Sequence, residues 1–253
     1  MSSPYYESNR ALAEYLLFHY GSPQDNAPPG FDSRAARNFP ARCISEGCDP
    51  ATLGPEARAL DLGCGVGRAS FELARHCGEV IGIDYSANFI AAANHLRQHG
   101  SMPFECVDEG ELTHSCLASV SPDIARARVS FQHGDALALP ADLGTFDVVL
   151  LANLLDRVPD PRQVLEKTPG LVKRGGQLII TSPFTWLLDY TPHDNWLGGF
   201  KQDGREVDSF QTVETILSTE FELTRRFTLP FVIREHVRKY QYCMAEAGTW
   251  IRR

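Results

Sequence analysis

The sequence predicts an α/β protein with a mostly parallel, doubly wound sheet and helices on both faces. Three observations support this fold class. Short apolar runs alternate with amphipathic helical stretches over residues 58–183, and that alternation implies parallel strands joined by crossover helices. A glycine-rich turn, GCGVG, follows the first apolar run. Polar residues stand at the ends of several later runs, where ligands bind in such sheets.

The elements follow one another in a regular order. Residues 4–20 predict an amphipathic helix, and residues 21–40, rich in Gly, Pro, Asn and Asp, predict a loop. Ser86 is suited to begin one helix and Gly100 to end it, and Asp160-Pro161 opens another. The expected strands are ALDL, EVIGID, VSFQHGD, FDVVLLAN and GGQLIITSP, and the first two expected core helices are RASFELARHC and ANFIAAANHLRQH.

Two segments interrupt this order. Residues 101–128 are too long for an ordinary connection and predict a surface excursion that contains a short helix. The C-terminal stretch, from about residue 221 to 250, predicts two long strands that form a hairpin at the sheet edge. We therefore expect a single domain over 1–253, with an N-terminal helical or lid segment (1–57) and a core (58–253).

Composition excludes several classes of function. The chain has 253 residues and a net charge of −8, which argues against nucleic acid as a partner because phosphate binding needs clustered Lys and Arg. No apolar run is long enough to span a membrane, and the N-terminus lacks the features of a signal peptide. The seven cysteines include no CxxC pair, so neither zinc nor a disulfide framework is favoured. We expect a cytoplasmic protein.

The chemistry is concentrated at strand ends. Gly63, Gly65 and Gly67 have the spacing GxGxG, not the GxGxxG of a dinucleotide-binding turn. Asp84 ends the next strand and could accept hydrogen bonds from two ribose hydroxyls. Asp135 follows a third strand, where it could meet an adenine amino group.

Taken together, from about Ala59 onward, these motifs resemble the class I S-adenosylmethionine-dependent methyltransferases. The resemblance implies a Rossmann-like, seven-stranded, mostly parallel sheet with an antiparallel C-terminal hairpin. It also implies S-adenosylmethionine as cofactor, with S-adenosylhomocysteine as product and no metal. The residues it assigns to the cofactor are Asp61, Gly63, Cys64, Gly65, Gly67, Asp84, Tyr85, Asp135, Ala136 and Asn153.

The fourth strand ends in LLANLLDR, beside the expected position of the cofactor's methyl group. Asn153, Asp156 and Arg157 are the candidate catalytic residues. The Asn-Pro-Pro-aromatic motif of the nucleic-acid amino-methyltransferases is absent here, which disfavours a nucleic-acid substrate. The alternative is that Asp156 caps a short helix and Arg157 pairs with it.

Further stretches resemble a narrower group, the ovothiol-pathway 4-mercaptohistidine N1-methyltransferases. They are YYESNRALAEYLLFHYG, NFPAR, DYSANFI, LANLLDRVPDP, TSPFTWLLDYTPHDNWLGGF and REHVRKYQY. The resemblance implies methyl transfer to an imidazole nitrogen of 5-thiohistidine, giving ovothiol A. It also implies a functional link to a 5-histidylcysteine sulfoxide synthase, to which such domains are often fused.

Charge and ring chemistry then nominate residues that contact this small-molecule acceptor. Arg42 or Arg157 could bind the carboxylate, and Asp156 the ammonium group or a ring N–H. Aromatic side chains could stack on the imidazole or shield the sulfonium, and residues 184–205 could close as a lid over it. The nominated acceptor residues are Tyr6, His19, Tyr20, Arg42, Tyr190 and Trp196.

Three alternatives remain open. One is a class I methyltransferase with another small acceptor, which would keep every cofactor residue. Another is a non-catalytic methyltransferase-like binding module. The third, a nicotinamide-dependent dehydrogenase, is disfavoured by the glycine spacing.

Overall fold

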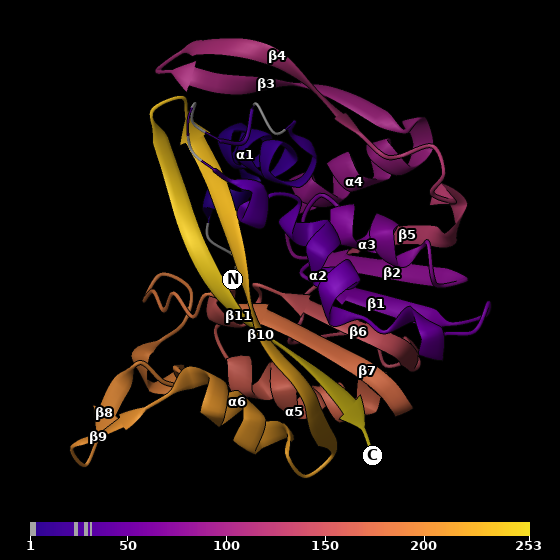
Figure 1. The fold of residues 1–253 in the computed structure, drawn as a ribbon, viewed down its shortest axis with the longest axis vertical. Helices are drawn as coiled ribbons and strands as arrows, with labels where there is room; N and C mark the ends of the chain where they lie inside the picture. Colours follow the sequence, from indigo (N-terminus) through magenta and orange to yellow (C-terminus); the bar gives the residue numbers. More distant parts are fainter. Residues whose placement is uncertain (1–3, 23–24, 28–29, 31) are drawn as a thin grey trace.

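A seven-stranded sheet forms the centre of the molecule in the computed structural model, which describes residues 4–22, 25–27, 30 and 32–253 (Figure 1). Its strand order is β10-β11-β7-β6-β1-β2-β5. Five adjacent strands, from β7 to β5 in this order, are parallel, as the sequence predicted. Their bounds are β1 Arg58–Leu62, β2 Glu79–Asp84, β5 Val129–His133, β6 Phe146–Ala152 and β7 Val172–Ser182.

The strand order reverses between β1 and β6, and this reversal positions the site. From β1 the chain continues through β2 to β5 at one edge, and it then returns to β6 on the other side of β1. The connections leaving β1 and β6 therefore diverge, which opens a crevice at the carboxyl ends of these two strands.

Helices cover both faces of the sheet (Figure 1). On one face lie α1 to α4, and on the other lie α5 and α6. A large apolar cluster fills each interface. None of the helices described here is long and apolar enough to cross a membrane. The helices are α1 Asn9–Tyr20, α2 Phe39–Gly47, α3 Arg68–Leu73, α4 Ala87–His99, α5 Pro161–Leu171 and α6 Ser209–Leu217.

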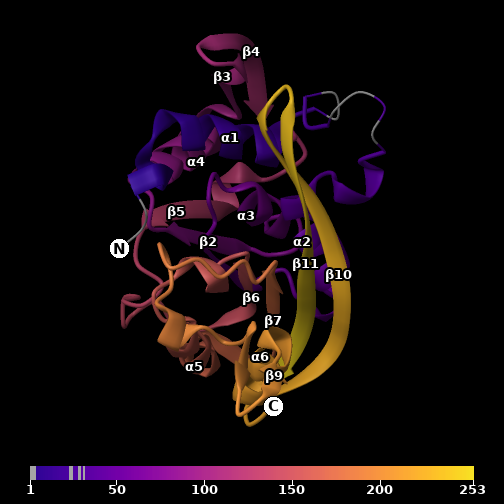
Figure 2. The ribbon, with the colours of Figure 1, turned by 90° about the vertical axis from the view of Figure 1, so that its left-hand side faces the viewer.

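The predicted C-terminal hairpin is confirmed. It consists of β10 (Phe221–His236) and β11 (Lys239–Arg252), and β11 pairs antiparallel with β7. Both strands are long enough to continue past the sheet, and their far end reaches α1 and the second hairpin of the molecule (Figure 2).

That second hairpin corrects the prediction for residues 101–128. The segment forms two antiparallel strands, β3 (Ser101–Glu109) and β4 (Leu112–Ser119), followed by a one-turn 3-10 helix, Arg126–Arg128. The short helix expected within this excursion is present only as that last turn, and the two strands that make up most of the segment were not predicted. The reason is tertiary: β3 and β4 pack against α1 and bury alternate residues such as Phe104, Cys106 and Ala118.

Smaller elements were also not predicted. The expected helix over residues 4–20 is divided into a 3-10 turn, Pro4–Glu7, and α1, because the Ser8 hydroxyl accepts a hydrogen bond from the Ala11 N–H and caps α1. The loop expected over 21–40 contains a further 3-10 turn and the start of α2. The remaining short elements are the 3-10 turns Arg34–Ala36, Pro50–Thr52, Leu155–Arg157 and His193–Asn195, and the strands β8 Phe200–Gln202 and β9 Arg205–Val207.

Candidate active site

A pocket lies at the carboxyl ends of β1, β2, β5 and β6. Its floor is the glycine turn after β1, and its roof is formed by α1, the start of α2 and the C-terminal hairpin. This is the position where the strand order reverses, so the site lies where doubly wound sheets bind their ligands.

The glycine turn needs glycine for steric reasons. Gly63, Gly65 and Gly67 have φ values of 80°, 55° and 86°, a region that side-chain-bearing residues rarely adopt. A Cβ atom on Gly63 would lie 2.9 Å from the Leu154 side chain, and one on Gly67 would lie 2.5 Å from the Phe131 ring. Gly63 and Gly65 line the pocket, so their bare backbone forms a cradle for a ligand.

Two strand-end carboxylates that the sequence analysis singled out, Asp84 and Asp135, line the same pocket. Asp84 accepts hydrogen bonds from the backbone N–H groups of Gly65 and Ser86, each at 2.8 Å. Asp135 accepts one from Leu137 N–H at 2.8 Å. Each carboxylate oxygen has a further lone pair for a ligand. Tyr85 and Ala136 line the pocket beside them.

Asp61 lies beneath the cradle and is 1% exposed. Its Oδ2 accepts a hydrogen bond from the Ser70 hydroxyl at 2.6 Å. Burial raises the pKa of this carboxyl to about 7. Cys64, next to it in the turn, also lines the pocket, and burial raises its thiol pKa well above the usual value, so this thiol is protonated and unreactive.

His19 of α1 covers the cradle from above. A Cβ atom on Gly65 would lie 3.3 Å from His19 Cε1. Desolvation, helped by nearby Arg68, lowers the His19 pKa to about 3, so its ring is neutral at physiological pH. Its buried Nδ1 has no partner. This unpaired nitrogen, the bare glycine backbone and the two strand-end carboxylates together fit the polar groups of S-adenosylmethionine.

The end of β6 carries the predicted polar residues. Asn153 has a left-handed backbone (φ 52°), and its side-chain oxygen accepts a hydrogen bond from the Thr181 hydroxyl at 3.0 Å. Asn153 and Arg157 line the pocket. The turn between them is the 3-10 helix Leu155–Arg157.

Asp156 does not line the pocket in the described part of the chain; it lies behind Arg157. Its Oδ2 accepts hydrogen bonds from Arg157 Nη1 and from Thr185 N–H, both at 2.8 Å. Asp156 is fully buried, and burial raises its pKa although Arg157 opposes that shift. In this arrangement Asp156 positions Arg157, which agrees with the alternative that the two residues pair.

Aromatic side chains of the N-terminal segment enclose the site. The Tyr15 ring lies 4.6 Å from Phe89, and Tyr6 lies 5.8 Å from Tyr15 and from Tyr190 (ring centroids). The Arg157 guanidinium lies over the Tyr190 ring at 5.0 Å and within hydrogen-bonding reach of Tyr6. Tyr6 and Tyr190, both nominated from the sequence, therefore lie next to the guanidinium of Arg157, which was also nominated.

The C-terminal hairpin supplies a wall that sequence reasoning missed. Phe231 pairs with Cys243 across the two strands, and Ile233 pairs with Gln241. All four residues line the pocket. The sequence signal that could have identified this wall is the spacing of two residues along each strand, since alternate residues of a strand share a face.

Four nominated acceptor residues are not among the described residues that line this pocket. Tyr190 instead lies under the guanidinium of Arg157. The Tyr20 hydroxyl donates to the Val66 carbonyl at 2.9 Å. Arg42 forms an ion pair with Glu46 and donates to the backbone carbonyls of Ala35 and Pro230. Trp196 donates to the Thr191 carbonyl. Their contact with an acceptor stays a prediction.

Comparisons with known proteins agree with this geometry. Residues 60–180 match the Methyltransferase domain family. A ubiquinone biosynthesis O-methyltransferase of Coxiella burnetii is 29% identical over 124 residues, which are 49% of this chain and 42% of that protein. A demethylmenaquinone methyltransferase of Shouchella clausii is 32% identical over 48% of this chain and 43% of that protein. The match thus spans less than half the length of these curated relatives.

Solved structures extend the likeness to the whole fold. Magnesium protoporphyrin IX methyltransferase from Synechocystis, with bound S-adenosylmethionine, superposes with a TM-score of 0.57 at 17% identity, covering 99% of this chain and 94% of that chain. An N-methyltransferase from Bradyrhizobium japonicum, with bound S-adenosylhomocysteine, has a TM-score of 0.51 at 16% identity over 95% and 98% of the two chains. Residues 60–180 therefore match a methyltransferase domain, and the whole chain has the fold of these methyltransferase structures.

Proposed function

We propose that the protein is an S-adenosylmethionine-dependent N-methyltransferase whose acceptor is an imidazole ring nitrogen of 5-thiohistidine, giving ovothiol A. The observation that carries the acceptor class is a single side chain. Arg157 brings a positive charge to the pocket at the end of β6, between an aromatic enclosure and the cofactor cradle. This arrangement suits a small, flat, carboxylate-bearing acceptor.

The cofactor half of the pocket binds S-adenosylmethionine and orients it. The glycine cradle and Asp61 suit the methionine part, since an ionised Asp61 would attract its ammonium group. Asp84 suits the ribose hydroxyls and Asp135 the adenine. Bound S-adenosylmethionine supplies a methyl group on a positively charged sulfur, and displacement by a ring nitrogen leaves the thioether S-adenosylhomocysteine.

Arg157 is already held in position before an acceptor binds. Its Nη1 donates to the Asp156 carboxylate, the Asp156 carbonyl and the Thr185 carbonyl. The guanidinium carries further N–H donors, which we assign to the acceptor's carboxylate. A prepositioned cation lowers the entropic cost of orienting the ring, and orientation is worth up to roughly 7–11 kcal/mol in well-aligned reactions.

The choice between nitrogen and sulfur is the main chemical demand, because the thiolate of the acceptor is the stronger nucleophile. Flat aromatic walls from Tyr15, Phe39 and Phe231 fix the plane of a ring. Gln241 adds an amide that can donate to the sulfur or accept from the ring. We infer that these walls aim the nitrogen, and not the sulfur, along the line of the breaking bond.

A general base is not required in this scheme. His19 is the histidine over the cradle, and its pKa of about 3 makes it a poor proton acceptor at neutral pH. An electron-rich thioimidazole attacks through a nitrogen lone pair, and its ring proton then passes to solvent. His19 can instead hydrogen-bond a ligand through its unpaired Nδ1.

The test is an incubation of purified protein with S-adenosylmethionine and reduced 5-thiohistidine, analysed by mass spectrometry, with histidine as control acceptor. A product one methylene heavier, with fragments that locate the methyl on the ring nitrogen, supports the proposal. Methyl on sulfur, or bound cofactor with no product, contradicts it. An Arg157→Gln variant in parallel shows whether turnover depends on the proposed site.

A second candidate is a class I methyltransferase for another small acceptor. It is favoured by the curated relatives, which carry names of quinone-biosynthesis methyltransferases, and by the aromatic pocket walls. An acceptor panel that includes demethylated quinone analogues separates the two. Cofactor binding with no turnover on any acceptor would favour the non-catalytic module.

A further inference from the structure

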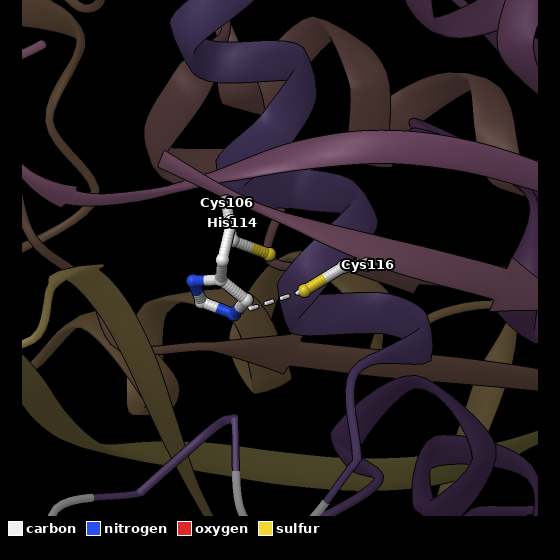
Figure 3. A group of neighbouring side chains, drawn as sticks. All are labelled: Cys106, His114 and Cys116. Atoms are coloured by element: carbon white, nitrogen blue, oxygen red, sulfur yellow. Dashed lines mark hydrogen bonds between the residues drawn. The ribbon is translucent and has the colours of Figure 1, made fainter. Parts of the chain in front are cut away.

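Three metal-binding side chains meet on the β3–β4 hairpin, outside the methyl-transfer pocket. Cys106 lies on β3, and His114 and Cys116 lie on β4. Cys106 and His114 are direct cross-strand partners, and Cys116 is two residues further along the same face. Figure 3 shows the three side chains pointing toward one another, and their ligand atoms all lie within 4.8 Å of each other.

We propose that Cys106, His114 and Cys116 bind a zinc ion. Thiolate and imidazole are the ligands that Zn²⁺ prefers, at about 2.3 Å for sulfur and 2.0–2.1 Å for nitrogen. In a tetrahedral site with these bond lengths, neighbouring ligand atoms lie about 3.3–3.8 Å apart. Cys116 Sγ and His114 Nε2 are already 3.3 Å apart, so small side-chain rotations would complete the three-ligand set.

The histidine is oriented as a zinc ligand requires. His114 Nδ1 lies 2.8 Å from Asp108 Oδ1, and a carboxylate there favours the tautomer with the proton on Nδ1. The lone pair is then on Nε2, which faces Cys116 (Figure 3). A carboxylate behind the histidine is the usual outer support of protein zinc sites.

Asp25 can supply the fourth ligand. Its Oδ1 lies 4.0 Å from His114 Nε2, and carboxylate oxygen is a common zinc ligand. Arg234 of β10 connects both sides of the cluster: it donates to the Asp25 carbonyl at 2.9 Å and to Asp108 Oδ1 at 2.8 Å. The guanidinium thus fixes the hairpin and the segment after α1 in the spacing that the site needs.

Such an ion would join two distant parts of the chain, the β3–β4 hairpin and the segment that follows α1. The hairpin already packs on α1 and β10, and α1 forms part of the roof of the pocket. A ligand from Asp25 would attach the segment that follows α1. The sequence analysis disfavoured zinc because the chain has no CxxC pair. That argument missed this site, whose ligands come from two strands and a separate loop.

The experiment measures zinc binding and does not depend on methyl transfer. Reduced protein, stripped by a chelator and dialysed, is titrated with zinc against a chromophoric competitor. We expect one zinc per chain. Cys116→Ser and His114→Gln should each raise the Kd at least about tenfold, and Asp108→Asn about 10- to 100-fold. Cobalt in place of zinc should show thiolate charge-transfer absorption that is weakened in Cys116→Ser.

The matched control is Cys243→Ser, which removes another partly exposed thiol and should leave zinc binding unchanged. Unfolding of each variant in chelator shows whether it folds like the stripped parent. The proposal is overturned if the parent binds zinc no tighter than the His114→Gln/Cys116→Ser double variant. It is also overturned if Cys106 and Cys116 form a disulfide in the presence of zinc.

Discussion

The two walls of the pocket are built in different ways. The sheet wall is made of strand ends: the glycine turn after β1, Asp84 after β2 and Asp135 after β5. The opposite wall joins α1, α2 and the β10–β11 hairpin. The first offers bare backbone and carboxylates, whereas the second offers mainly rings and aliphatic side chains.

We infer from this difference that the two walls bind different ligands. Under the proposed function, the carboxylates and the backbone cradle would recognise the polar groups of the cofactor, and the rings would recognise the shape of the acceptor. We therefore expect substitutions in the sheet wall to change cofactor affinity, and substitutions in the opposite wall to change acceptor use. Arg157 and Asp156 lie where the two walls meet, so variants of these residues test most directly whether the walls have different roles.

Asp156→Ala should have the largest effect. It would leave Arg157, whose side chain is 26% exposed, without its carboxylate, and the Thr185 N–H without an acceptor. Removing one partner of a buried ion pair costs about 3–5 kcal/mol, and the partial exposure of Arg157 favours about 3 kcal/mol. Urea unfolding measures this loss, and Asp194→Ala, at an exposed position, is the control. A loss below about 1 kcal/mol would show that the pair is not a structural anchor.

Arg157→Gln comes next. It leaves the buried Asp156 carboxylate without its cation and so lowers stability as well, but of the two ligands it should affect only the acceptor. A charged hydrogen bond contributes about 1.5–3 kcal/mol, so kcat/KM for the acceptor should fall about 10- to 100-fold. Cofactor affinity should stay unchanged in calorimetry. Arg157→Lys keeps the charge without the planar fork and should give an intermediate loss. An equal loss of cofactor affinity would contradict the division between the walls.

The pH dependence of cofactor binding tests the sheet wall. The Asp61 pKa of about 7 lies above its unfolded value of 3.8, so the ligand-free fold is stabilised by protonation and loses stability as pH rises through this window. Pairing with a cofactor ammonium requires the ionised carboxylate instead. S-adenosylmethionine affinity should therefore fall about tenfold per pH unit below 7.

Asp61→Asn is the matched variant for this measurement, because it keeps the shape of the side chain and removes its titration. Its cofactor affinity should be weak and nearly independent of pH between 5 and 7. A parent protein with equally flat affinity would show that Asp61 does not face the ammonium group.

Tyr20→Phe should have the smallest effect. It removes the hydrogen bond to the Val66 carbonyl and should cost about 1 kcal/mol of stability. Acceptor kcat/KM should not change, because Tyr20 packs behind the glycine turn. Loss of acceptor binding with normal stability would restore the sequence-based assignment of Tyr20 to the acceptor site.

Sequence patterns were sufficient to predict the bounds of an element where interactions between nearby residues decide the structure. The bounds of β2 and α4 match the predicted segments, because the Ser86 hydroxyl caps α4 and Gly100 takes the left-handed turn that ends it. The pocket position of the residues proposed to bind the cofactor follows from strand ends in the same way. A strand end is visible in the sequence, and the fold then brings all strand ends to one edge.

Prediction failed where distant contacts decide. Residues 101–128 became a hairpin because α1 offers an apolar surface for one of its faces. Arg42 was nominated for a ligand carboxylate by charge alone; the structure adds that it pairs with Glu46, four residues later, and its contact with an acceptor stays a prediction. Such a spacing on a helix is visible in the sequence and favours a local pair.

Under the proposed function, the long C-terminal hairpin would make acceptor choice a separable module. The methyltransferase match ends at residue 180, and the wall residues Phe231, Ile233, Gln241 and Cys243 all follow it. Exchanging the distal half of β10 and β11 between homologues would therefore create chimeras with an unchanged cofactor turn and a new acceptor preference. The four residues form two cross-strand pairs, so such a graft must preserve the register between β10 and β11. Both strands must therefore be transplanted together.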